Sequence, residues 1–305
     1  MLSHAHLPQD LLCNVNLLLL CLEDDDNKKD TLPFDFLLKV PNLEHLKLFC
    51  CLGLTEIFRS QKLEVHDKIL SSLRNLTLDS LEELKSIGLE HPWVKPYCER
   101  LESLKLNDCP QVEKIVSGAV SFMNMKELDV TGCERIKYLF TFSAAKSLVQ
   151  LVNLSIQNCE SIKEIVKKEN EDASHEIIFG RVKTLNLDSL PLLGSFYSGN
   201  ATLQFSRLKK VMIVKCPNMK TFSQGDIKAP FFYGVESSVG DFDLTFHNDL
   251  NTTIKELSHK QVRNSFWMIE FLYFYKLNST FRSVHSAIML YCFPMFLLQE
   301  FILQI

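Results

Sequence analysis

The chain has 305 residues, a formal net charge of −4 and a pI of about 6.2. This balance gives no basic footprint for nucleic acid, so a nucleic-acid partner is not expected. The length would suit one or two domains, but a repeat array grows by stacking and needs no central core. Length alone therefore does not decide the number of domains.

Residues 1–40 contain one degenerate repeat and a charged loop that runs from Glu23 to Asp30. The apolar stretch before the loop follows Asp10 and lacks the basic segment of a signal peptide. We therefore expect a cytoplasmic protein. The apolar residues of the degenerate repeat are Leu12, Val15, Leu17 and Leu20.

A six-position apolar template recurs seven times between residues 41 and 235. In the unit that starts at Leu151, Leu154 and Ile156 alternate with polar residues, which is the period of a strand. The later positions, Cys159, Ile162 and Ile165, have the period of a turn or short helix. The other units start at Leu43, Leu73, Leu101, Met125, Val182 and Leu208. Successive starts differ by 30, 28, 24, 26, 31 and 26 residues, close to the spacing of leucine-rich repeats; an ordinary leucine-rich α/β domain is the alternative.

These repeats predict an α/β fold, a leucine-rich-repeat solenoid. It would have a curved parallel β-sheet on its concave face, and irregular turns and short helices on its convex face. In each unit the residue inside the apolar pair and the one after it should reach the concave face, where they form two chemically mixed rows suited to protein recognition. The first row is Lys47, Thr77, Lys105, Asp129, Ser155, Asn186 and Met212. The second row is Phe49, Asp79, Asn107, Thr131, Gln157, Asp188 and Val214.

Cysteine occurs periodically, at the same template position of five units. This use favours a buried thiol that behaves as a small hydrophobe and accepts weak backbone hydrogen bonds. Disulfides between consecutive coils are the alternative, because strands ~5 Å apart nearly satisfy bridge geometry. The lack of a secretory signal favours thiols. The five residues are Cys51, Cys109, Cys133, Cys159 and Cys216.

Beyond the array, we expect residues 236–278 to hold an insertion and one weak further repeat, and residues 279–305 to form an atypical hydrophobic tail. The weak repeat runs from Ile269 to Leu277. The tail is interrupted by Pro294 and Glu300, and its apolar run is shorter than the ~20 residues that span a bilayer. Membrane insertion is therefore not favoured.

The sequence offers no catalytic, cofactor-binding or metal-binding constellation. His4 and His6 form an isolated pair, and no HExxH spacing occurs. Cys50 and Cys51 are adjacent, so they should point to opposite faces, and a redox role is not expected. We therefore expect no enzyme activity, no cofactor and no small-molecule substrate.

Three units carry a resemblance to a known family. They are KELDVTGCERIKYLF (Lys126 to Phe140), VNLSIQNCESIKEIV (Val152 to Val166) and KKVMIVKCPNMKTF (Lys209 to Phe222). They resemble the leucine-rich repeats of plant nucleotide-binding, leucine-rich-repeat disease resistance proteins of the coiled-coil class, and phrases such as GLEHPWVKPY look legume-like.

The resemblance implies an intracellular immune receptor whose repeats sense a pathogen effector or a guarded host protein, and contact a nucleotide-binding domain if they are part of a longer receptor. The sequence departs from that family because it has no G-x-x-x-x-G-K-[ST] phosphate loop. It therefore looks like a repeat region without the nucleotide-binding domain. Two alternatives stay open: the substrate-recognition subunit of a ubiquitin ligase, and a truncated, non-functional paralogue.

Overall fold

A computed structural model describes residues 16–20, 32, 37, 39–51, 53–58, 70–116, 120–169, 176–237 and 249–258. The chain divides into two compact units, Met1–Ser258 and His259–Ile305, and every described residue belongs to the first. Several predictions lie outside the described residues. They concern the pair His4 and His6, the loop at 23–30, the weak repeat at 269–277 and the tail at 279–305.

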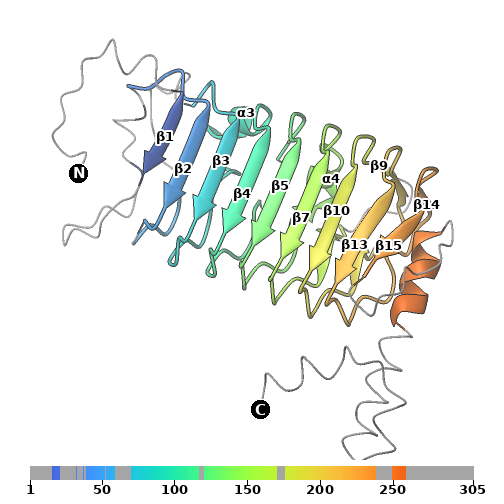
Figure 1. Cartoon of the computed structure of the whole chain (residues 1–305). Coiled ribbons are helices and arrows are strands. Elements are labelled where there is room, and N and C mark those ends of the chain that lie inside the picture. The colour runs from blue at the N-terminus through green and yellow to red at the C-terminus, as the bar shows by residue number, and fades with distance from the viewer. Residues whose placement is uncertain are drawn as a thin grey trace, which may run out of the picture. The chain divides into compact units, whose positions relative to one another are not determined.

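The first unit is built on one parallel sheet, in which nine of the described strands follow one another in chain order (Figure 1). Every pair of neighbours is parallel, as expected when each strand belongs to one coil of a solenoid. The strands are β1 (Leu17–Leu20), β2 (His45–Phe49), β3 (Asn75–Asp79), β4 (Ser103–Asn107), β5 (Glu127–Thr131), β7 (Asn153–Gln157), β10 (Thr184–Asp188), β13 (Lys210–Val214) and β15 (Gly234–Glu236).

The apolar template forms the core. All six template positions in all seven units are buried, and none is more than 4% exposed. The alternation of buried and partly exposed residues along each strand follows from the two faces of a β-strand. The seven units supply β2, β3, β4, β5, β7, β10 and β13, while β1 and β15 add one strand at each side. The predicted leucine-rich-repeat solenoid is confirmed.

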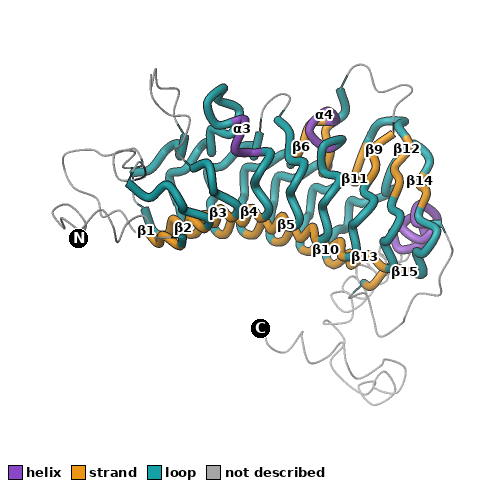
Figure 2. The backbone as a smooth tube through the Cα atoms, turned by 90° about the horizontal axis from the view of Figure 1, so that it is seen from above, coloured by secondary structure: helices purple, strands orange, loops and turns teal. Residues whose placement is uncertain are grey.

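The return segments lie on the convex side of the curved sheet (Figure 2). They hold two one-turn helices, α3 (Lys95–Cys98) and α4 (Phe142–Ala145), and residues 250–258 are also helical. They also form two small parallel sheets that the template did not predict. One contains β6 (Phe140–Thr141), β8 (Glu164–Lys167) and β11 (Ser195–Tyr197); the other contains β9 (Glu176–Ile178), β12 (Thr202–Gln204) and β14 (Ile227–Lys228).

The residue after each of the seven template strands adopts a left-handed backbone conformation, with φ between 48° and 66°. In six of these bends the N–H of that residue donates to the carbonyl at the end of the next strand; for example, Asn158 donates to Asp188 over 3.0 Å. Only Gly132 is a glycine, the residue that tolerates a positive φ without steric cost. The other six are Cys50, Ser80, Asp108, Asn158, Ser189 and Lys215.

The periodic cysteines are buried thiols, and none of the seven described cysteines forms a disulfide. The thiols also donate weak hydrogen bonds to backbone carbonyls. Cys216 Sγ lies 3.6 Å from the Leu187 oxygen in the preceding coil. Burial raises the pKa of Cys216 to about 11. The neighbouring Cys109 and Cys159 thiols raise the pKa of Cys133, so Cys133 and Cys216 stay protonated and unreactive.

Candidate functional site: the concave face of the sheet

The two predicted rows lie on the concave face in continuous register. Pairing between neighbouring strands places Asp129 beside Ser155, and Ser155 beside Asn186. In the second row the same pairing joins Thr131, Gln157 and Asp188. Each residue of both rows is partly exposed, while its neighbours along the strand are buried. Both rows thus lie in register and partly exposed on one face. Their contact with a partner stays a prediction.

The concave face also has a third row, which the sequence analysis missed. It consists of the first residue of each template strand, which points to the same side as the other two rows. Continuing the alternation one residue back from the first buried strand position would have revealed it. The row is His45, Asn75, Ser103, Glu127, Asn153, Thr184 and Lys210.

Charges on the first coils of this face are largely neutralised by one another. Lys47 Nζ lies 2.6 Å from Asp79 Oδ2, and Lys105 Nζ lies 3.1 Å from Glu127 Oε1. In each pair the lysine belongs to the first row, which runs between the other two. The carboxylate belongs to the second or third row, on the next strand. A partner would find few uncompensated charges here.

The centre of the face, over β5, β7 and β10, has a different character. Ser155 Oγ accepts hydrogen bonds from Gln157 Nε2 at 3.0 Å and from Asn186 Nδ2 at 3.4 Å. On either side of it, Asp129 Oδ1 and Asn186 Oδ1 are buried acceptors without a hydrogen-bond partner among the described residues. Buried acceptors are normally paired, since an unpaired one costs about 1–3 kcal/mol. The centre of the face is therefore short of hydrogen-bond donors.

The described residues lack the features of two other kinds of site. They contain no group of three or more His, Cys, Asp or Glu side chains placed to hold a metal ion. Within the same ranges, no helix is both long and apolar enough to cross a membrane. Cys50 and Cys51 differ as predicted, Cys50 being exposed and Cys51 buried.

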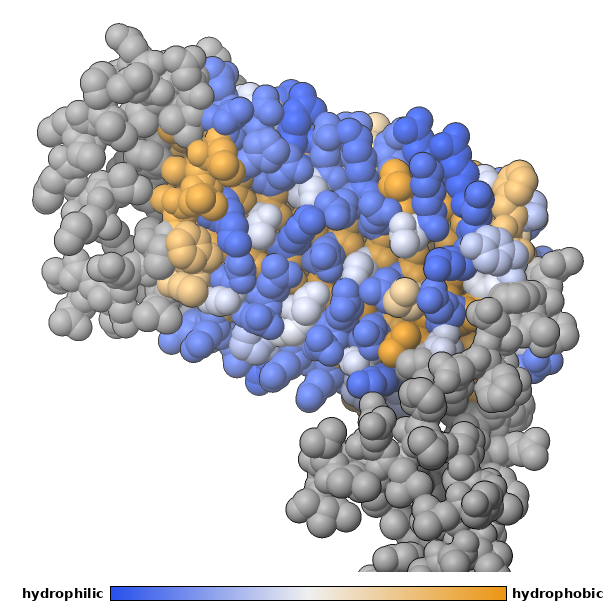
Figure 3. Space-filling model, in the orientation of Figure 1, coloured by the Kyte–Doolittle hydropathy of each residue, from blue (hydrophilic) through white to orange (hydrophobic). Residues whose placement is uncertain are grey.

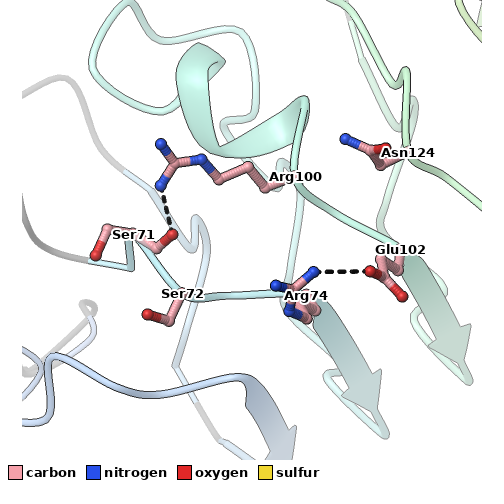
Figure 4. Close-up of a pocket in the computed structure, with 6 residues that line it drawn as sticks. All are labelled: Ser71, Ser72, Arg74, Arg100, Glu102 and Asn124. Atoms are coloured by element: carbon pink, nitrogen blue, oxygen red, sulfur yellow. Dashed lines mark hydrogen bonds and ion pairs between the residues drawn. The ribbon is translucent and has the colours of Figure 1, made fainter.

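One small polar pocket lies where β3 and β4 begin, at the edge of the sheet (Figure 4). Arg74 Nη1 contacts Glu102 Oε1 at 2.8 Å, and Lys126 Nζ contacts the other oxygen of Glu102 at 2.6 Å. These contacts hold the pKa of Glu102 below its ordinary value, the Lys126 hydrogen bond being the largest cause. Arg100 donates to the Ser71 backbone oxygen at 2.6 Å. The pocket is thus lined by groups that already satisfy one another.

Comparison with known proteins identifies the type of repeat. Residues 121–224 match a family model described as "Plant disease resistance protein RPS2-like, leucine-rich repeats". The matched repeats are similar to those of plant disease resistance proteins. This match includes all of β5, β7, β10 and β13, so the donor-poor centre of the concave face lies within the matched residues.

Two relatives extend the comparison. "Probable disease resistance protein At5g63020" of Arabidopsis thaliana is 24% identical over 178 residues, which cover 58% of this chain and 18% of that protein. "Putative adenylate cyclase regulatory protein" of Trypanosoma equiperdum is 29% identical over 132 residues, which cover 43% of this chain and 19% of that protein. The chain thus matches less than a fifth of the length of either relative, and the two names describe different activities.

Proposed function

We propose that this chain is a protein-recognition module in plant disease resistance, and that its concave face binds a pathogen effector or a guarded host protein. The main support is the donor-poor centre of that face, within the repeats that match the disease-resistance family. A solenoid of this kind is a scaffold for protein contacts, and its variable rows are the part that can differ between partners.

The partner's surface should supply hydrogen-bond donors. Asp129 and Asn186 each have an acceptor oxygen that no described residue pairs with, and Ser155 lies between them in the row. A lysine, an arginine or backbone N–H groups of the partner would satisfy these acceptors, at the cost of small rotations of the side chains. The absence of cofactors, the lack of enzyme activity and the cytoplasmic location expected from the sequence belong to the same proposal.

Binding of the full chain to individually purified effectors and host proteins tests this proposal. Calorimetry should detect at least one partner. The double substitution Asp129→Lys with Ser155→Arg should abolish that binding, because it places positive charge where donors are expected to enter. A control double substitution, Lys137→Glu with Glu160→Arg, changes exposed residues of the return segments and should leave binding intact. The proposal would be refuted if the concave substitutions left the affinity for the partner unchanged, or if no protein partner bound.

A further inference from the structure

A second surface lies at the edge of the sheet where the strands begin, apart from the concave rows. Four exposed basic residues flank the first template position of the coils that contain β10 and β13. Because Thr184 pairs with Lys210, arginine lies opposite arginine and lysine opposite lysine, in coils about 5 Å apart. We call these residues the edge cations: Arg181, Lys183, Arg207 and Lys209.

The described surroundings of the edge cations do not neutralise them. None of them forms an ion pair with the residues that the structure describes, whereas the adjacent Lys210 contacts Glu236 at 2.6 Å. Like charges on neighbouring strands repel one another and lower stability. The same edge positions in coils two to four carry alternating signs instead, at Arg74, Glu102 and Lys126. In the coils of β10 and β13, the edge where the strands begin thus holds a concentration of positive charge that folding itself does not require.

Exposed aromatic side chains continue the same columns into the next coil. Pairing of Lys210 with Gly234 places Phe231 and Tyr233 at the positions equivalent to Arg207 and Lys209. Phe231 is 64% exposed and Tyr233 is 51% exposed. The Tyr233 N–H donates to the Lys209 carbonyl over 2.8 Å, which fixes this side of the surface. Hydrophilic side chains cover the start of β10 in Figure 3. Arginine and exposed aromatic residues together are typical of binding hot spots.

We propose that the edge cations, with Phe231 and Tyr233, form a docking site for an acidic protein segment that also carries an apolar side chain. The guanidinium groups of Arg181 and Arg207 suit carboxylates, and the two aromatic rings would cover the apolar group. A nucleic acid fits less well, since its phosphates continue beyond two coils, where Gln150 and Val152 occupy the equivalent positions. The overall charge of −4 also opposes a long polyanion.

Fluorescence anisotropy of the full chain tests this proposal with a labelled glutamate-rich peptide that contains one leucine. Three other probes accompany it: the same peptide with glutamine in place of glutamate, the peptide with serine in place of leucine, and oligothymidylate. The test variant combines Arg181→Gln, Lys183→Gln, Arg207→Gln and Lys209→Gln. The control removes as many charges from exposed return-segment residues, with Lys85→Gln, Lys137→Gln, Lys163→Gln and Lys220→Gln.

We expect the test variant to bind the glutamate-rich peptide roughly tenfold more weakly than the wild type, because several modest charge contacts are lost together. The control should bind like the wild type, and Phe231→Ser should remove the preference for leucine over serine. The thermal midpoint of the test variant should equal or exceed that of the wild type, because repulsion is relieved. Should the fourfold variant fail to fold, Arg207→Gln alone provides the same comparison at smaller amplitude.

Three outcomes would overturn the proposal. The first is equal loss of peptide binding in the test and control variants, which would indicate general charge attraction. The second is tighter binding of oligothymidylate than of the peptide, which would indicate a nucleic-acid site. The third is a fall in thermal midpoint in the test variant, which would assign the edge cations to folding. None of these outcomes depends on the concave face, so the two proposals can fail separately.

Discussion

The edge where the strands begin differs between the two halves of the array. In coils two to four, Glu102 joins Arg74 and Lys126 through ion pairs of 2.8 and 2.6 Å. In coils six and seven, the equivalent columns hold only the edge cations. Both groups of coils have the same buried template, so the core does not require this difference in edge charge. A surface whose charges satisfy one another serves stability, and one whose charges repel is available for a partner.

The largest expected effect removes the support that both halves share. Leu154 lies in β7, which belongs to coil five, between the two compared groups of coils. It is 3% exposed. Leu154→Ala should lower the free energy of unfolding by about 2–5 kcal/mol, because it leaves a cavity in a continuous core. Hydrogen exchange followed by mass spectrometry should show faster exchange in both halves. Val149→Ala, at a site that is 43% exposed, is the control and should change little. Faster exchange in only one half would show that the halves unfold independently.

The next effect concerns the bend between coils four and five. Gly132 has a φ of +66°, and a Cβ there would lie 2.2 Å from Asp108 Oδ1. Gly132→Ala should destabilise the chain by about 1–3 kcal/mol in urea unfolding. Asn158 occupies the same bend one coil later, with a φ of 53°. Asn158→Gly should therefore be nearly neutral or slightly stabilising, and an equal loss at both sites would mean that the bend is not the cause.

Exchanging the charge patterns between the two parts of the edge should give smaller changes in stability, of opposite sign. Glu102→Gln leaves Arg74 and Lys126 without their shared carboxylate, and should cost about 0.5–1 kcal/mol at low salt. Lys183→Glu places a carboxylate beside Lys209, and should add a few tenths of a kcal/mol. Urea unfolding at low and high salt checks both values, since salt should reduce both. Effects of the same sign would contradict the comparison.

The smallest effect is the pH dependence that Glu102 contributes. Its pKa in the folded chain lies below the ordinary value of 4.5, because Lys126 and Arg74 stabilise the carboxylate. A depressed pKa means that the unfolded chain binds the proton more readily. The stabilisation is therefore present above about pH 4.5, and is lost as the pH falls through the folded-state pKa. Wild type and Glu102→Gln should differ in stability at pH 6 and converge toward pH 3; a constant difference would exclude this linkage.

The sequence by itself determined the repeat register, because an apolar residue every two or three positions has only one way to be buried in a stacked coil. That register placed Leu154 and Ile156 in the core, and two of the three concave rows on the surface. The third row was not predicted, because the alternation was extended only toward the C-terminus from the first buried residue of each strand. The free thiols of the described cysteines were also expected, because the sequence lacks a secretory signal.

Only the tertiary structure decided which polar residues become neighbours. Coils differ in length, so Arg181 and Arg207 meet across 26 residues while Arg207 and Phe231 meet across 24, and no fixed period connects all three. The left-handed bends were also invisible, since six of the seven are not glycine. Burial of apolar residues is a local property of the pattern, whereas ion pairs, unpaired acceptors and the edge cations depend on the registration of separate coils.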